Sequence, residues 1–253
     1  MKNPKNLFKA AIKDGRHQLG IWNTIGGNTV PELLGGAGFD WVLIDCEHSA
    51  IETVEVLPAL QAIASNPQVS AAVRPAANDP TVFKRVLDMG AQTLLVPFIQ
   101  SVEEAEAAVT AMRYGPGGVR GMAGMTRATR YGKVDAYFTS AEDDLCLILQ
   151  IETVKGLAAL EDIATTDGVD AIFFGPADLS ASMGYPGQMA HPEVVGAIED
   201  GLRRLRALGV PGGVMALDVD AAKRFIELGS LFTAVGVDLV LLADAVDQLR
   251  REF

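Results

Sequence analysis

Short runs of consecutive apolar residues recur along the chain, and each is followed by a segment with helical spacing of apolar positions. The runs begin near Gly20, Val42, Ala71, Leu94, Ile148, Ile172, Val214 and Ala234. They are continuous rather than alternating, as in parallel strands that are buried on both faces. Eight such units in 253 residues predict a (β/α)8 TIM barrel, a single domain over residues 1–253 with a short helix over residues 5–13.

An open, doubly wound α/β sheet is the alternative fold. It would require a Gly-rich phosphate-binding turn after the first strand, and Ile25-Gly26-Gly27-Asn28 is a poor match to that motif. Asp79 followed by Pro80 predicts the start of a helix, because Asp caps helices and Pro fits the first helical position. The stretch Tyr114–Tyr137 is rich in Gly, Arg and Met and predicts a long loop, a feature that is usually functional in a compact domain.

The overall composition bounds the classes of function. The formal net charge of −11 argues against nucleic acid and anionic membrane surfaces, which favour basic patches. The first twenty residues lack the apolar region of a signal peptide, and no apolar stretch is long enough to span a membrane. Cys46 and Cys146 lie in apolar runs, which is typical of buried thiols in a reducing compartment. We therefore expect a soluble, cytoplasmic protein.

Polar residues gather where several of the predicted strands end. In a (β/α)8 barrel the carboxyl ends of the strands meet on one face, where the catalytic residues lie. The residues at these ends are Trp22, Asp45, Glu47, His48, Arg74, Gln150, Glu152, Gly175, Pro176, Ala177 and Asp178. The seventh and eighth strands end in apolar or small residues and predict an apolar wall.

Glu152 and Asp178 follow consecutive strands, so they are neighbours around the barrel. Two carboxylates without a nearby Cys or His suit a hard divalent cation such as Mg²⁺ or Mn²⁺, with water and substrate oxygens as its other ligands. The alternative is that each carboxylate pairs with an arginine or caps a helix. The residues alone leave both interpretations open.

His48 follows Asp45 by three residues, so the carboxylate is expected to orient the imidazole and raise its basicity, although helix capping is the alternative. Arg74 ends an apolar strand and needs an anionic partner, either a protein carboxylate or a substrate carboxylate that it binds bidentately. His17 and His191 lie in a loop and at a helix start, and we expect both at the surface.

Arg120, Arg127 and Arg130 of the long loop are expected to be solvated or interfacial, with contact to an anionic substrate as the alternative. The segment Gly175–Asp178 places backbone N–H groups at a helix start, where they can bind a carboxylate. Together with a metal, Arg74 and the His48–Asp45 pair, these groups indicate enolate chemistry on a 2-oxo acid.

The sequence resembles the HpcH/HpaI aldolase family of metal-dependent pyruvate aldolases, over nearly its whole length. The segments that carry the resemblance are Gly38–His48, Val73–Pro75, Gln92–Pro97, Arg113-Tyr114, Gly118–Gly121, Gln150–Thr153, Phe174–Ser180 and Ala234–Asp238. Cys46 is a departure, because relatives often carry glycine or another small residue there.

The resemblance implies a TIM barrel whose last helix is exchanged between partners in a hexamer, a trimer of dimers. It implies a divalent metal (Mg²⁺, Mn²⁺ or Co²⁺) and no organic cofactor. The residue roles that it implies are metal ligation by Glu152 and Asp178, acid–base catalysis by His48 supported by Asp45, enolate formation by Arg74, and substrate binding by Gln150, Gly175, Pro176, Ala177 and Trp22.

The implied reaction is reversible aldol cleavage of a 4-hydroxy-2-oxo acid to pyruvate, or hydroxypyruvate, and an aldehyde. Three alternatives remain open from the sequence: a CoA-thioester lyase of the citryl- or malyl-CoA type, a class I aldolase with a Schiff-base lysine, and a non-catalytic barrel that binds 2-oxo acids. The acidic chain argues against the first, and the nearest lysine for the second is Lys155.

Overall fold

The computed structural model describes all residues of the chain, 1–253, and shows a closed barrel of eight parallel strands in sequence order. The predicted TIM barrel is therefore confirmed, and the doubly wound sheet is excluded. The strands are β1 (Gln18–Asn23), β2 (Trp41–Asp45), β3 (Ser70–Arg74), β4 (Thr93–Val96), β5 (Cys146–Ile151), β6 (Ala171–Phe174), β7 (Gly212–Met215) and β8 (Ser230–Val237).

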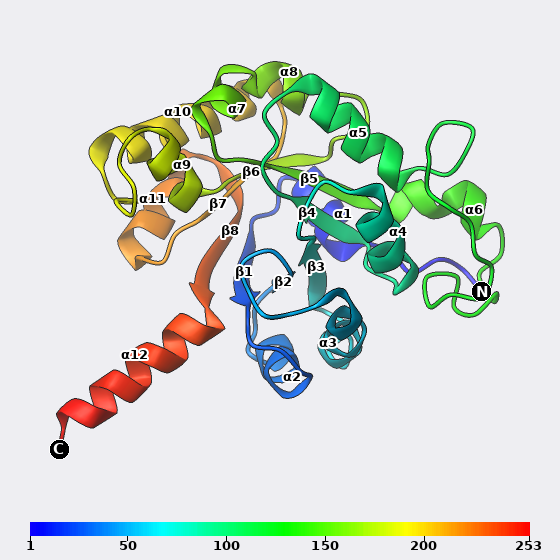
Figure 1. Ribbon diagram of the computed structural model, residues 1–253, viewed down its shortest axis with the longest axis horizontal. Helices are drawn as coiled ribbons and strands as arrows, with labels where there is room; N and C mark the ends of the chain where they lie inside the picture. Colours follow the sequence, from blue (N-terminus) through cyan, green and yellow to red (C-terminus); the bar gives the residue numbers. More distant parts are fainter.

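Helices surround the strands, and the last helix extends away from the barrel so that the C-terminus lies far from it (Figure 1). The α-helices are α1 (Leu7–Lys13), α2 (Thr29–Gly36), α3 (Val56–Ile63), α4 (Pro80–Asp88), α5 (Val102–Met112), α6 (Tyr137–Ser140), α7 (Val154–Ala158), α8 (Leu160–Ala164), α9 (Pro176–Ser182), α10 (Pro192–Leu208), α11 (Val219–Leu228) and α12 (Asp238–Arg251). Two 3₁₀ turns are η1 (Thr53–Glu55) and η2 (Ala141–Asp144). No helix is both long enough and apolar enough to cross a membrane.

The predicted start of the helix at Asp79 and the predicted long loop are both confirmed. The Asp79 side chain accepts hydrogen bonds from the N–H groups of Thr81 and Val82 and so caps α4, with Pro80 in the first turn. The expected long loop is also present, because no helix or strand forms between α5 and α6.

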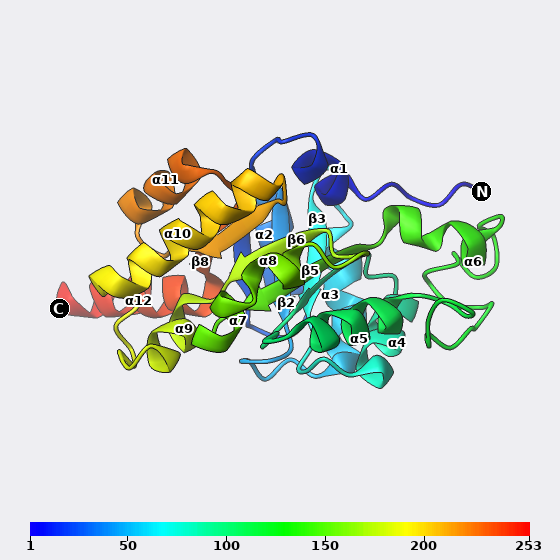
Figure 2. The ribbon, with the colours of Figure 1, turned by 90° about the horizontal axis from the view of Figure 1, so that it is seen from above.

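The barrel interior is filled by aromatic and aliphatic side chains, and α1 closes its amino end (Figure 2). Along β2, Trp41 and Leu43 point into the barrel while Val42 and Ile44 pack against the helices, which explains why the strand has no polar face. Phe8 of α1 packs edge-on against Trp41 and Phe232, with ring centroids 5.6 and 5.4 Å apart. The layer of large rings is therefore continuous from α1 into the barrel.

Gly20 of β1 gives the Trp41 indole its space, because a Cβ at position 20 would overlap with that ring. We expect Gly20→Ala to lower the free energy of unfolding by at least about 1–3 kcal/mol, the usual cost of overpacking a core. Urea denaturation measures this cost. Gly196→Ala is the matched control, because position 196 lies in α10 with no atom within 4 Å of an added Cβ. That change should stabilise the helix by about 0.5–1 kcal/mol, and equal midpoints for the two variants would contradict the prediction.

Candidate active site

The carboxyl ends of β2, β3, β5 and β6 bring most of the predicted polar residues to one mouth of the barrel. Asp45 and Arg74 are partners in register on β2 and β3, so their side chains start from adjacent positions. Glu47 and His48 lie on the loop after β2, and Glu152 directly follows β5. This clustering follows from the parallel topology, because every strand ends on the same face.

Arg74 and Asp45 form a buried, bidentate ion pair. The distances are 2.8 Å from Arg74 Nε to Asp45 Oδ1 and 2.6 Å from Nη2 to Oδ2. Burial alone would raise the pKa of Asp45, but the hydrogen bonds and charge of Arg74 outweigh it and hold the pKa below its usual value. The guanidinium also lies over the Trp22 ring, 5.3 Å from its centroid. Asp45 is therefore a carboxylate whose position is fixed by Arg74.

The expected contact between Asp45 and the His48 imidazole is not present. Asp45 Oδ1 accepts hydrogen bonds from the backbone N–H groups of Glu47 and His48, at 3.0 and 3.3 Å, so it shapes the loop but does not reach the ring. The His48 Nε2 atom lies 3.8 Å from Glu47 Oε2 and 3.9 Å from Asp178 Oδ2. The His48 side chain is 63% exposed, so its imidazole faces the solvent-filled mouth.

Glu47 belongs to the site as well, although no catalytic or metal-binding role was predicted for it from the sequence. Its Oε2 atom lies 3.0 Å from Arg74 Nη1. Burial raises the pKa of Glu47, in opposition to the charge of Arg74. Arg74 therefore contacts two carboxylates, one on the last residue of β2 and one on the loop that follows it.

Glu152 is as deeply buried as Asp45, with 1% of its surface exposed. Its Oε1 atom accepts a 2.8 Å hydrogen bond from the Phe98 N–H, and its Oε2 atom accepts one from Gln150 Nε2. Burial raises the pKa of Glu152 to about 7, and the negative charges of Glu47 and Asp178 act in the same direction. Glu152 forms no ion pair with a basic side chain of the chain, and Arg74 pairs with Asp45 and Glu47 instead.

Gly175 directly follows β6 and lies beside this carboxylate. A Cβ at position 175 would lie 2.5 Å from Glu152 Oε2 and 2.6 Å from Gln150 Nε2, so only glycine fits. Pro176 and Ala177 begin α9, whose first intrahelical bond is donated by the Leu179 N–H, so the N–H groups of Ala177 and Asp178 precede it. Asp178 itself is half-exposed at the mouth.

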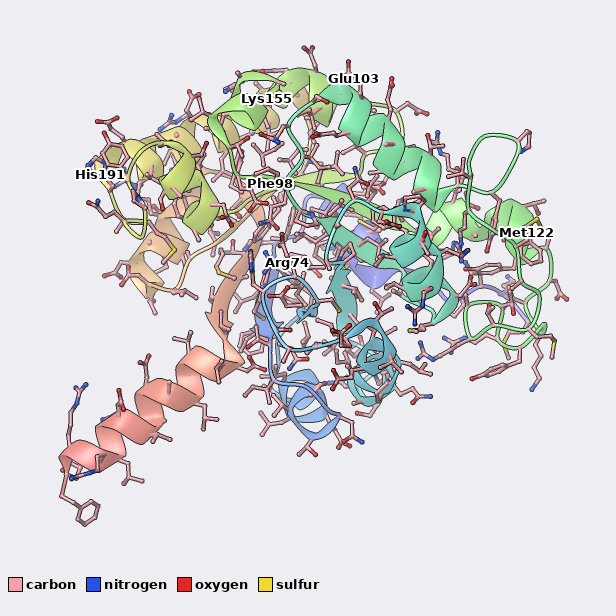
Figure 3. All side chains as sticks on the ribbon, viewed as in Figure 1. Arg74, Phe98, Glu103, Met122, Lys155 and His191 are labelled. Atoms are coloured by element: carbon pink, nitrogen blue, oxygen red, sulfur yellow. The ribbon has the colours of Figure 1, made fainter.

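Phe98 was not identified as a site residue from the sequence. It contributes through its backbone N–H, which donates to Glu152. The residue follows β4 with a φ of 60°, in the left-handed region that is unusual for a residue with a side chain. Figure 3 places Phe98 near Arg74 at the centre of the barrel mouth, whereas Lys155 lies on the outer helical layer. Lys155, the nearest lysine in sequence to the strand ends, is exposed on α7.

Other predicted residues lie outside the mouth. His191 caps α10 and stacks on Tyr185 with a 3.6 Å centroid distance, and His17 Nε2 lies 3.0 Å from Thr233 Oγ1. Both are half-buried rather than free surface residues. The expectation for Arg120 is wrong: the residue is buried, it pairs with Asp88 at 3.2 Å and it lies over the Tyr114 ring.

Cys46 is half-buried between Asp45 and Glu47. Burial raises the pKa of its thiol to about 12, and the nearby carboxylates of Asp45, Glu52 and Glu55 add to this shift. The thiol therefore stays protonated, as a packing role requires. Cys146 of β5 is buried inside the barrel.

Comparison with known proteins agrees with this geometry. The family described as HpcH/HpaI aldolase/citrate lyase matches residues 18–245. A pyruvate aldolase of Rhizobium etli is 53% identical over 253 residues, which cover 100% of this chain and 99% of the relative. A hydroxypyruvate/pyruvate aldolase of Sagittula stellata is 48% identical, with 100% of both chains covered.

A solved structure shows the same fold. It is an HpcH/HpaI aldolase/citrate lyase family protein from Burkholderia cenocepacia, with a TM-score of 0.93 and 36% identity over 98% of this chain and 99% of that one. The match of the family over nearly the whole barrel, together with the relatives of 48–53% identity, establishes the assignment that the strand-end motifs suggested. The chain belongs to the HpcH/HpaI aldolase/citrate lyase family.

Proposed function

We propose that this protein catalyses the reversible aldol cleavage of 4-hydroxy-2-oxo acids to pyruvate, or hydroxypyruvate, and an aldehyde. The family makes it an aldehyde-lyase. The observation that carries the proposal is the barrel mouth itself, where the buried Glu152 and half-exposed Asp178 lie beside an exposed imidazole and a buried guanidinium. These are the groups that bind a 2-oxo acid, hold enolate charge and move a proton.

Glu152 and Asp178 are the residues that would hold a divalent cation, Mg²⁺ or Mn²⁺. The donor set fits such an ion, because Glu152 is a carboxylate whose pKa is raised by burial and by its negative neighbours, and it forms no ion pair with a basic side chain. No cluster of three or more His, Cys, Asp or Glu side chains is arranged to hold a metal, so water and substrate oxygens would complete the coordination. When bound, the cation supplies Lewis-acid polarisation of the 2-oxo group.

The oxo-acid substrate would be positioned by the segment after β6. The N–H groups of Ala177 and Asp178 can receive its carboxylate, and Pro176 presets the helix start that aims them. Gly175 lets the substrate approach closely, Gln150 contacts the Glu152 carboxylate, and Trp22 forms the floor under Arg74. The apolar ends of β7 and β8 would leave room for the aldehyde half, and a cavity of about 610 Å³ adjoins Pro176 and the β7 end at Met215.

Arg74 and His48 would divide the charge and proton chemistry. Arg74 has five N–H donors, and its pairs with Asp45 and Glu47 leave further N–H groups on both terminal nitrogens for the developing enolate oxygen. His48 would take the proton from the 4-hydroxyl group during cleavage and return it during condensation. Asp45 supports this step indirectly, through Arg74 and through the backbone of the His48 loop.

The exposed helix α12 indicates self-association. Leu239, Leu242, Val246 and Leu249 form one stripe along it at spacings of three and four residues, and each is more than half exposed. Asp238 anchors the helix start, because its carboxylate accepts hydrogen bonds from Asn23 Nδ2, the Thr24 N–H and the Ile25 N–H at 2.7–3.0 Å. We infer that α12 is exchanged with a second copy of this chain, as in the hexamer that the family resemblance implies.

Metal removal is the first test of the mechanism. Chelation with EDTA would remove the cation from Glu152 and Asp178 and leave the oxo acid without polarisation. It should therefore abolish cleavage, and Mg²⁺ or Mn²⁺ should restore it. Glu152→Gln should lower kcat/KM by at least about 10²-fold, as expected for loss of an electrostatic stabiliser. Glu103→Gln, on the outer layer (Figure 3), is the matched control and should keep full activity. EDTA-resistant activity with a borohydride-trapped pyruvate adduct would contradict the metal proposal.

His48→Ala tests the proton transfer. We expect kcat for aldol cleavage to fall about 10²–10⁴-fold, the usual contribution of a general acid–base residue. Exchange of the pyruvate methyl protons in deuterated water should be less affected, because it does not involve the 4-hydroxyl group. His17→Ala is the matched control, because His17 directly precedes β1 at the amino end of the barrel, away from the mouth. Unchanged cleavage by His48→Ala would remove His48 from the mechanism.

The helix exchange is tested by introducing a charge into the apolar stripe of α12. Leu242→Glu places a carboxylate in the stripe and should shift the assembly toward smaller species in light scattering after size exclusion. Gln248→Glu is the control. It adds the same charge about 140° around α12 from the centre of the stripe, and its assembly should resemble that of the wild type. Equal molar masses for Leu242→Glu and the wild type would show that the stripe is not an interface.

A further inference from the structure

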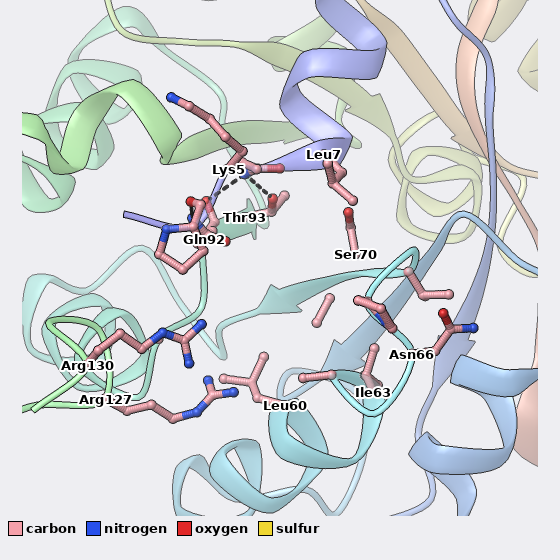
Figure 4. A pocket seen from close by; sticks show the side chains of 17 residues that line it. Lys5, Leu7, Leu60, Ile63, Asn66, Ser70, Gln92, Thr93, Arg127 and Arg130 are labelled. Carbon is pink, nitrogen blue, oxygen red and sulfur yellow. Dashed lines mark hydrogen bonds between the residues drawn. The ribbon is translucent and has the colours of Figure 1, made fainter. Parts of the chain in front are cut away.

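A cavity at the amino end of the barrel has a mixed polar and apolar lining whose charged side chains, Lys5, Arg127 and Arg130, are all basic. It encloses about 270 Å³ and lies where β3 and β4 begin, with Ser70 and Thr93 in its wall. Arg74 is at the other end of β3, so the cavity and the proposed active site lie at opposite ends of the same strand. Figure 4 shows the Arg127 and Arg130 side chains of the long loop directed into it.

The two guanidinium groups have no anionic partner. None of the residues that line the cavity is Asp or Glu, and neither Arg127 nor Arg130 forms an ion pair anywhere in the chain. The side chain of Arg127 donates only to the Met89 carbonyl, at 2.9 Å. Burial and the neighbouring charge of Arg130 lower the pKa of Arg127, so the two cations destabilise one another. This is unexpected in a chain with 32 acidic and 21 basic residues.

The loop is built to keep both side chains in this position. Thr129, which lies between them, is buried, and its hydroxyl bonds to the Gly124 carbonyl at 2.7 Å and to the Gly132 N–H at 3.0 Å. Arg130 has a φ of 51°, a left-handed conformation that costs on the order of 1 kcal/mol in a residue with a side chain. Gly90 leaves the space for the other guanidinium, since a Cβ there would lie 2.8 Å from Arg127 Nη1.

We propose that this cavity binds a small oxyanion, such as inorganic phosphate or the phosphate or carboxylate group of a small metabolite. Two guanidinium groups offer paired N–H donors whose planar geometry matches phosphate and carboxylate oxygens. An anion would offset the repulsion between Arg127 and Arg130, and Ser70 and Asn6 provide further polar groups in the wall. The volume is near the lower limit for ligand sites, so a small ligand fits better than a nucleotide.

The test is isothermal titration calorimetry, in which the intact enzyme is titrated with inorganic phosphate and, in a parallel experiment, with succinate. We expect saturable binding of at least one probe. Arg130→Gln should weaken it at least about tenfold, since it removes a charge-assisted donor pair. Ser70→Asp leaves both arginines in place but puts a carboxylate in the wall, and it should abolish binding.

Arg16→Gln is the matched control, because it removes one positive charge from an exposed loop between α1 and β1 outside the cavity, and it should bind as the wild type does. Arg130 makes no side-chain hydrogen bond, so its substitution should leave the fold intact, and Ser70→Asp is an independent second variant. The proposal is overturned if the wild type shows no saturable binding of either probe at millimolar concentration. It is equally overturned if both cavity variants bind the probes as tightly as the wild type.

Discussion

The buried ion pair between Arg74 and Asp45 is the interaction on which the organisation of the barrel mouth depends. It joins neighbouring strands in register and fixes the loop that carries Glu47 and His48, because Asp45 also accepts two backbone hydrogen bonds from that loop. Removing one partner of such a pair leaves an uncompensated buried charge, at a cost of about 3–5 kcal/mol. Variants of Asp45 would therefore alter the position of Arg74, even though the carboxylate is not in contact with the imidazole.

Charge is distributed unevenly along the barrel axis. At the carboxyl end, burial raises the pKa of Glu152, the negative charges of Glu47 and Asp178 add to the shift, and the hydrogen bonds from Gln150 and the Phe98 N–H oppose it. At the amino end, Arg127 and Arg130 lie together without any carboxylate. A β3 strand of five residues separates the two regions, roughly 13 Å between its end residues at about 3.3 Å per residue, too far for direct pairing across the barrel. Each end is electrostatically incomplete on its own, which is the physical basis of both ligand proposals.

The sequence was sufficient for the barrel, because strands buried on both faces must be continuously apolar and helix caps such as Asp79 act locally. Side-chain pairing at the mouth was harder to predict. The three-residue spacing between Asp45 and His48 suggested a contact, yet Arg74, 29 residues later, takes both oxygens of Asp45. The burial of Arg120 depends in the same way on distant partners, Asp88 and Tyr114, which no local pattern shows.

Phe98 shows most clearly what a sequence pattern cannot contain. Its contribution is a backbone N–H that reaches Glu152 only because the residue adopts a left-handed conformation, which costs on the order of 1 kcal/mol and leaves no trace in the residue type. Together with Gln150 on the other oxygen and the missing side chain at Gly175, this bond fixes both Glu152 oxygens before any ligand arrives. A carboxylate that is held in this way needs little rearrangement when it binds a cation, and the backbone strain after β4 is therefore part of the preorganisation of the site.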